Sequence, residues 1–193
     1  MPNWAYTQYH CDGDKEQLKQ LHSIMEELES MKAPGLHENG FSQTWLGNLV
    51  IKLGGEWDKI YCRGSWENLL LHDDGTVSFS AESAWDEPNE VRVFIEKKFS
   101  NIHLYYQTEE CGEGIYKTND STGKYFPEKY YLWVECEETE YYDSLDKLIK
   151  EVQSITGSKN LKTFESCVEA LESYSQQNDD LGYSLEEFSI IDD

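Results

Sequence analysis

The chain has 193 residues and a mass of 22.5 kDa, and its 38 acidic and 16 basic residues give a formal net charge of −22. This charge argues against direct nucleic-acid binding and against binding to an anionic membrane, because both need a local excess of lysine and arginine. Hydrophobic residues make up 38% and aromatic residues 13% of the chain, a composition that excludes wholesale disorder.

The sequence also predicts where the protein resides. No stretch approaches the roughly 18 apolar residues of a membrane-spanning helix, and the N-terminus has no basic segment followed by an apolar run. The five cysteines are odd in number and none are paired as C-x-x-C. We therefore expect a cytoplasmic protein with reduced thiols, and a single disulfide stays open as an alternative.

The first half of the chain predicts a strand and a helix, followed by an insertion at about residues 31–64. Residues 4–11 alternate aromatic or small side chains with polar ones, as a strand does. Asp14 is placed to cap a helix over residues 14–30, whose apolar residues recur at helical spacing: Leu18, Leu21, Met25 and Leu28. Within the insertion, a loop leads to a short helix over residues 45–53.

A hairpin, a second helix and another strand follow. The turn Asp73-Asp74-Gly75 between residues 65–72 and 76–82 is a strong hairpin signal. Pro88 opens a helix whose apolar stripe is Val91, Phe94, Ile95 and Phe99, and residues 102–108 form a strand. The order predicts an α+β protein with a ferredoxin-like βαββαβ core, in which two helices cover one face of an antiparallel sheet.

The rest of the chain predicts extra strands and helices. Strands are expected at 115–118 and 129–136, and helices at 141–155 and 164–174. Residues 135–193 carry 16 acidic and 4 basic residues, a denser negative charge than in the preceding part. We therefore expect a ferredoxin-like domain over residues 1–136 and an acidic helical extension over residues 137–193.

Three short motifs then suggest a family: Pro2-Asn3-Trp4, Ala84-Trp85-Asp86-Glu87-Pro88 and Lys97-Lys98-Phe99. Together they resemble the YubB ferredoxin-like domain family of phage- and plasmid-associated proteins of unknown function. The family's Trp-Gly-Thr-Lys-Trp segment is matched only in outline by residues 53–57. The resemblance implies a ferredoxin-like fold and a source in bacteria that carry mobile genetic elements, and it implies no catalytic residues.

Motifs of catalysis and metal binding are missing from the sequence. The five histidines have no chelating spacing, and the acidic residues at 179–187 do not match a calcium loop. Cys111 lies among carboxylates, which oppose thiolate formation. We expect no cofactor, no metal and no catalytic residue, although 38 acidic residues leave an unrecognised hydrolase open.

Aromatic residues are the candidates for binding. Most of the six tryptophans are expected in the core, but Trp85 lies at a strand-to-helix junction, where its ring could line a groove. Tyr105 and Tyr106 are neighbours on a strand, so at least one should reach the outer face of the sheet. The candidate binding residues are Trp57, Trp85, Tyr105 and Tyr106.

The function predicted from these features is that of a non-enzymatic binding or accessory protein of a bacterial mobile genetic element. It would bind a protein partner through the exposed sheet face or the Trp85 junction, in an oligomeric state that the sequence leaves open. One alternative is an acidic DNA mimic that blocks a nucleic-acid-binding enzyme, although the average surface charge is about fourfold more dilute than that of DNA. The other alternative is a hydrolase.

Overall fold

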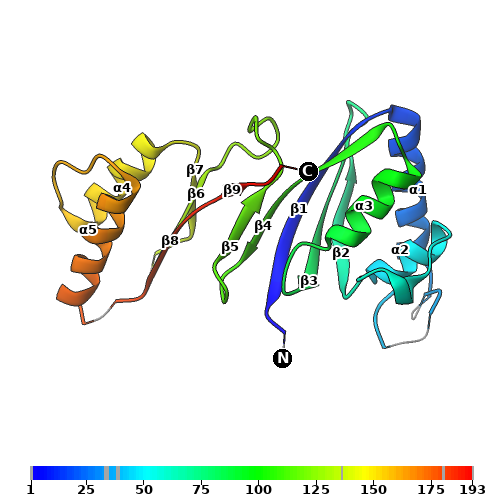
Figure 1. The fold of residues 1–193 in the computed structure, drawn as a ribbon, viewed down its shortest axis with the longest axis horizontal. Coiled ribbons are helices and arrows are strands. Elements are labelled where there is room, and N and C mark those ends of the chain that lie inside the picture. Colours follow the sequence, from blue (N-terminus) through cyan, green and yellow to red (C-terminus); the bar gives the residue numbers. More distant parts are fainter. Residues whose placement is uncertain (1, 33–34, 38–39, 136, 180, 193) are drawn as a thin grey trace. The chain divides into compact units, whose positions relative to one another are not determined.

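The structure is a computed structural model that describes residues 2–32, 35–37, 40–135, 137–179 and 181–192. Over these residues it is an α+β protein with five α-helices, a six-stranded mixed sheet and a three-stranded antiparallel sheet (Figure 1). The chain divides into two compact units, one of residues 1–120 with 191–193 and one of residues 121–190. None of the helices in the described ranges is both long and apolar enough to cross a membrane.

The sheet of the first unit is antiparallel between every neighbouring pair of its strands β2, β3, β1, β4 and β5. In chain order these strands are β1 (Trp4–Gly13), β2 (Gly64–Leu71), β3 (Val77–Ala84), β4 (Ile102–Glu110) and β5 (Ile115–Thr118). With β9 (Ser189–Ile190), the six-stranded order is β2-β3-β1-β4-β5-β9. In the register of the central strand β1, Tyr9 lies opposite both Phe79 and Tyr106.

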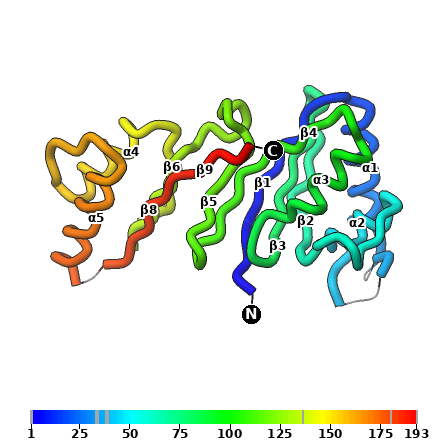
Figure 2. Tube along the Cα trace, viewed as in Figure 1, coloured from blue at the N-terminus to red at the C-terminus, as the bar shows by residue number. Residues whose placement is uncertain are grey.

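Two helices, α1 (Lys15–Ser30) and α3 (Asn89–Lys98), lie on one side of this sheet (Figure 2). Asp14 caps α1 as predicted, because its carboxylate accepts a hydrogen bond of 2.9 Å from the amide of Gln17. The predicted stripes of both helices contribute to one hydrophobic core with the buried face of the sheet. Burial of apolar stripes against a sheet face is what orders such helices.

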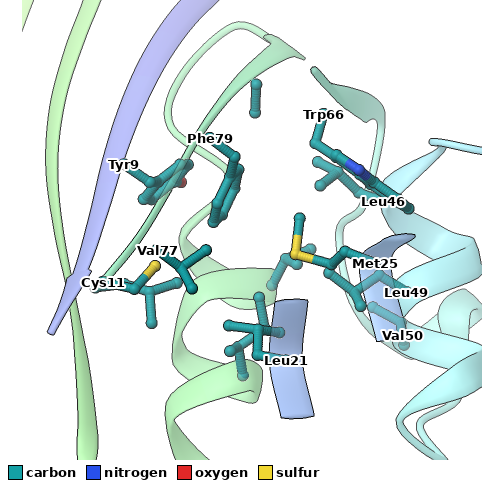
Figure 3. Packing of buried hydrophobic residues seen from close by; sticks show 14 of the residues in the cluster. Tyr9, Cys11, Leu21, Met25, Leu46, Leu49, Val50, Trp66, Val77 and Phe79 are labelled. Atoms are coloured by element: carbon teal, nitrogen blue, oxygen red, sulfur yellow. The ribbon is translucent and has the colours of Figure 1, made fainter. Parts of the chain in front are cut away.

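The same core extends to the insertion, which contains α2 (Leu46–Lys52) and the 3₁₀ turn η1 (Trp57–Lys59). Figure 3 shows the rings of Tyr9 and Phe79 side by side in this core. The two rings are stacked, with their centroids 4.7 Å apart. Side chains of α2 fill the adjoining space beside Met25 and Trp66, namely Leu46, Leu49 and Val50. The predicted short helix is therefore confirmed, and its burial anchors the loops on either side of it.

The predicted hairpin is also confirmed, because β2 and β3 pair directly across the Asp-Gly turn. Gly75 has a φ of +81°, a conformation that glycine adopts without a steric penalty. The carboxylate of Asp74 accepts hydrogen bonds from the amide and the hydroxyl of Thr76, at 2.9 and 2.6 Å. These bonds hold the pKa of Asp74 below its ordinary value.

The second unit has its own sheet and its own core. Its sheet has the order β7-β6-β8, with strands β6 (Tyr130–Val134), β7 (Glu140–Tyr142) and β8 (Tyr183–Glu187). Helices α4 (Leu145–Thr156) and α5 (Phe164–Gln177) supply buried residues to a core shared with these strands. The core contains Leu132, Leu148, Val152, Cys167, Leu171 and Leu185.

Three features of this second unit differ from the predictions. The helix expected from residue 141 begins at Leu145, because Tyr141 and Tyr142 pair with Tyr131 and Tyr130 as part of β7. Strand β8 was not predicted, since its pairing partner β6 is distant in sequence. The strand expected at 129–136 belongs to the second compact unit, which begins at residue 121, because its pairing partners are β7 and β8.

Candidate functional site

A hollow lined by aromatic residues lies in the first unit, beside α2 and η1. Its cavity volume is about 560 Å³. We call it the aromatic pocket and define it by its lining residues: Phe41, Trp45, Trp57, Asp58, Lys59, Ile60, Tyr61, Cys62 and Arg63. Of the residues predicted from sequence to bind a partner, Trp57 lines this pocket.

Trp45 is the most buried aromatic ring of the pocket, with 3% of its surface exposed. It precedes α2 and makes an isolated β-bridge with Ser65, so it is tied both to the helix and to the start of β2. A Cβ at Gly47 would lie 2.3 Å from the Trp45 ring, and therefore only glycine leaves room for the ring at its present place. Glycine at position 47 is thus part of how the pocket is built.

The rings meet at different angles and so form separate walls. Phe41 and Trp45 are nearly parallel, with an interplanar angle of 11° and centroids 5.7 Å apart. Trp57 meets Trp45 edge to face, at 64° and 5.6 Å. Phe41, Trp57 and Tyr61 keep 36%, 38% and 47% of their surface exposed. Clustered exposed aromatic surface of this kind marks an interaction site more often than isolated exposed residues do.

The charges around the pocket are mixed. Asp58 and Arg63 line it, while Lys59 is held by the carboxylate of Glu56 at 2.6 Å. The carboxylate of Glu90 accepts a hydrogen bond of 2.6 Å from the amide of Tyr61 and thereby fixes the rim.

Two polar groups of the lining bear on its chemistry. Burial, with Glu90 as a further cause, raises the pKa of Cys62 to about 11, so its thiol stays protonated and is a poor nucleophile. The indole Nε1 of Trp45 is buried, and no acceptor for it lies among the residues that the structure describes. Folded proteins rarely leave such a donor unpaired, and local departures from ideal packing concentrate at functional sites.

The adjacent tyrosines predicted as binding residues lie on opposite faces of β4. Tyr106 is only 2% exposed and packs in the core, where the guanidinium of Arg92 lies 5.1 Å from its ring centroid. Tyr105 points to the other face and is partly exposed, with its ring edge-on to that of His103 at 4.4 Å. The predicted alternation is therefore present, and the buried face of Tyr106 is unavailable to a partner.

Trp85 lies at the junction between β3 and α3 and is 47% exposed. Its φ of +76° belongs to the left-handed region, which is uncommon for residues other than glycine. The backbone amide of Trp85 donates a 2.8 Å hydrogen bond to the carbonyl of Asn3, which holds the residue there. A strained backbone under a half-exposed indole makes this junction a second place where binding could occur.

A buried polar network beneath α3 was missed by sequence reasoning. Glu87 accepts hydrogen bonds from the hydroxyl of Tyr9 at 2.7 Å and from Nε of Arg92 at 3.1 Å. Glu96 is hydrogen-bonded to His103 Nδ1 at 2.9 Å and to the amide of Leu104 at 2.8 Å. One signal in the sequence could have indicated this network: Arg92 lies next to Val91 and near Ile95 on the buried stripe of the helix, where a charged residue needs a partner.

The part of this network formed by Tyr9, Glu87 and Arg92 has the shifted pKa values of a reactive site but no access for a substrate. Burial, followed by the charge of Glu87, raises the pKa of Tyr9. Burial also raises the pKa of Glu87, although the charge of Arg92 opposes that shift. The side chains of Glu87 and Arg92 are 1% and 4% exposed. The network therefore serves to join α3 to β1 and β4.

The second unit contains a hollow of a different kind, with a volume of about 690 Å³. We call it the acidic pocket, because four glutamates line it: Glu137, Glu138, Glu140 and Glu151. Leu132, Val134 and Ile155 contribute apolar surface. The hydroxyl of Tyr142 donates a hydrogen bond to Glu140, and the pKa of this tyrosine is raised by burial and by that bond.

Potential metal ligands do not cluster in the described part of the chain, where no group of three or more His, Cys, Asp or Glu side chains could hold an ion. Cys11, Cys62, Cys111 and Cys167 are free thiols, and Cys136 lies outside the described residues. Comparison with family models, with curated proteins and with solved structures finds no match to this chain. The site must therefore be interpreted from its own geometry.

Proposed function

We propose that this chain is a non-enzymatic binding module that holds a protein partner, with the aromatic pocket as the contact. The supporting observation is the group of partly exposed rings, Phe41, Trp57 and Tyr61, around a hollow whose inner wall is Trp45. Aromatic residues in such pockets dominate the binding energy of many interfaces, because they bury large areas at low cost in side-chain entropy.

The same proposal includes the fold of the first unit and the kind of genetic element that encodes the protein. The antiparallel order β2-β3-β1-β4, with α1 and α3 contributing to one core, favours a ferredoxin-like arrangement for the first unit. Together with the motifs that resemble the YubB domain family, it supports an accessory protein of a bacterial mobile genetic element. In this setting the module acts by occupying or recruiting a partner rather than by converting a substrate.

A hydrolase receives less support from the geometry. Glu87, a carboxylate with a raised pKa, is enclosed in the buried polar network, and among the described residues Asp58 is the only acid that lines the aromatic pocket. General acid–base chemistry needs two positioned groups within reach of the substrate. In the first unit, the carboxylate with the raised pKa therefore lies away from the open pocket.

The acidic pocket supports a DNA mimic as the second candidate function, in which its glutamates would face a basic partner. Residues 121–190 carry fifteen acidic and six basic residues, a net charge of −9, and the remaining residues carry −13. The charge is thus spread over both units, whereas a mimic of DNA needs a dense array. For this reason we favour the aromatic contact.

Capture by matched variants tests the proposal. The full chain and its Trp57→Ala and Tyr141→Ala variants are immobilised and exposed to a lysate of a bacterial host, and bound proteins are quantified. Tyr141 is 42% exposed in β7, so its substitution controls for the loss of any exposed aromatic ring. We expect Trp57→Ala to lose at least 80% of a captured protein, a roughly fivefold effect typical of interface anchors, and Tyr141→Ala to retain it.

Salt separates the two candidate functions. The affinity of an aromatic contact changes little between low and high salt. A partner bound to a DNA mimic by charge is released, because the Debye length falls from about 10 Å at 0.1 M to about 3 Å at 1 M. Equal capture by wild type and Trp57→Ala contradicts the aromatic contact. Release of the protein by moderate salt in both would favour the mimic.

A further inference from the structure

The aromatic pocket has the ring arrangement of a cation receptor. The face of an aromatic ring carries partial negative charge and attracts cations within about 6 Å, and tryptophan does so most strongly. Here two indoles meet at 64°, with Phe41 stacked beside one of them, so rings approach the hollow from more than one direction. Phe41, Trp57 and Tyr61 are partly exposed there, so more than one ring is open to a compact cation in the hollow.

The charges that line the pocket have both signs. The carboxylate of Asp58 lines the pocket, and so does Lys59, whose ammonium pairs with Glu56 at the exposed surface, 2.6 Å away. Arg63 is a second lining cation, and the net charge of −22 biases the surface as a whole toward positive ligands. Because Asp58 and Arg63 have opposite signs, their individual effects on a charged ligand can be separated.

The nature of the walls selects among cations. A primary ammonium has three N–H donors that need acceptors when they leave water, and ring faces replace such hydrogen bonds poorly. A trimethylammonium group has no N–H donor and presents methyl groups to the rings, so it loses little hydration on entry. Recognition of this group by aromatic cages is a known use of cation–π attraction.

The open mouth of the pocket indicates how the group arrives. Sites for free small molecules bury most of the ligand, about 70–90% of its surface. Three rings of this pocket are 36–47% exposed, and the nearby Leu36 is 40% exposed. A side chain can thus enter the pocket while the polypeptide that carries it lies on the rim. We propose that the aromatic pocket binds the trimethylammonium group of a trimethylated lysine in the protein partner, an inference that rests on the proposed function.

Titration of the full chain with three matched peptides tests this inference by tryptophan fluorescence and calorimetry. The peptides are identical except for one side chain, which is trimethyllysine, lysine, or an isostere whose quaternary nitrogen is replaced by carbon. The isostere keeps the shape and removes the charge. We expect trimethyllysine to bind at least tenfold more tightly than either alternative. Equal binding of the isostere would overturn the cation receptor, and tighter binding of choline than of the peptide would overturn the protein source.

Variants of the charged lining residues test whether affinity for trimethyllysine changes in the direction that its positive charge requires. Asp58→Asn should weaken trimethyllysine binding about threefold, and Arg63→Ala should strengthen it about threefold, because one removes an attractive charge and the other a repulsive one. Each substitution should change binding of the uncharged isostere less than it changes binding of trimethyllysine. Trp57→Ala should abolish binding, with Tyr141→Ala as the unaffected control. Shifts of the same sign for Asp58→Asn and Arg63→Ala would contradict the inference.

The inference and the proposed function can fail separately. If Trp57→Ala loses the captured protein but the three peptides bind alike, the aromatic contact stands and the trimethyllysine assignment falls. If the peptides are discriminated as expected but Trp57→Ala captures as much protein as wild type, the proposed contact with the captured partner falls.

Discussion

The buried polar network and the aromatic pocket lie in the same unit but differ in access. An enzyme site combines groups of shifted pKa with access for a substrate, and here these two properties belong to different places. The network contains Glu87, Arg92 and Tyr9 at hydrogen-bonding distance, with side chains that solvent does not reach. The pocket is open, four of its nine lining residues are aromatic, and Asp58 is the only acid among the described residues that line it. Shifted pKa values in a closed core indicate a structural role, and the open pocket is the place where we propose that a partner binds.

The raised pKa of a carboxyl group does not by itself mark a catalytic acid. Desolvation raises the pKa of Glu87, and such a shift in a cleft would suggest a general acid. Here the same desolvation results from packing α3 against the sheet, with Arg92 placed to compensate the carboxylate. The cause of the shift is thus the core itself.

The largest expected effect is on the network. Arg92→Ala leaves Glu87 buried without its cation, and breaking a buried pair in this way costs about 3–5 kcal/mol of unfolding free energy. Urea denaturation followed by fluorescence measures the loss of unfolding free energy. Lys147→Ala, which removes an exposed ion pair with Asp143, is the control and should change stability by less than about 1 kcal/mol. A loss below 1 kcal/mol for Arg92→Ala would show that the network is not structural.

The next effect concerns the wall of the pocket. Gly47→Ala introduces a Cβ into the space of the Trp45 ring, so the ring must move, and overpacking of this kind costs about 1–3 kcal/mol. We expect ligand binding to be lost together with this stability, as measured by titration and denaturation of the same sample. In contrast, Trp57→Ala should lose binding with less loss of stability, because Trp57 is 38% exposed. Retained binding in Gly47→Ala would show that Trp45 is not part of the contact.

A smaller effect of opposite sign is expected at Trp85. A left-handed conformation costs a residue with a side chain about 1–2 kcal/mol, and glycine adopts it freely but has a more disordered unfolded state. Trp85→Gly should therefore stabilise the protein by about 0.5–1 kcal/mol. Trp85→Ala keeps the Cβ and should show no such gain. Thermal and urea unfolding measure the effect. Destabilisation by Trp85→Gly would mean that the Trp85 ring stabilises the fold by packing against its neighbours, which would argue against a role in binding.

The smallest effect is on acid stability. Burial alone would raise the pKa of Glu96, but hydrogen bonds from His103 and the Leu104 amide, with the charge of Arg92, outweigh it and lower that pKa. A carboxyl group whose pKa is lowered by folding stabilises the native state above its unfolded pKa of about 4.3, and this stabilisation is lost as the pH falls through the folded value.

Glu96→Gln should accordingly have a flatter dependence of unfolding free energy on pH below about 4.5 than wild type, since the titrating group is gone. The measurement is a series of urea denaturations between neutral and acidic pH. Glu172→Gln on the exposed face of α5 is the matched control and should follow the wild-type curve. An unchanged slope in Glu96→Gln would mean that its hydrogen bonds do not distinguish the folded from the unfolded state.

Elements that depend on neighbours in the chain were predictable. Asp14 caps its helix, Gly75 turns its hairpin, and the stripe from Leu18 to Leu28 is buried, because each depends on the local backbone or on side chains three or four residues apart. The opposite faces of Tyr105 and Tyr106 follow from the period of a strand in the same way. Such features are determined by the sequence itself.

Tertiary structure alone decided which of these residues form a site. Trp57 was a candidate from sequence, but its neighbours in the pocket, Phe41 and Trp45, are brought to it by the packing of α2 and η1. The burial of Arg92, the pairing of β6 with β8 and the left-handed conformation of Trp85 likewise depend on contacts between distant segments. Periodicity specifies which side of an element faces the core, whereas a pocket requires knowing which elements meet, and that depends on packing of the whole chain.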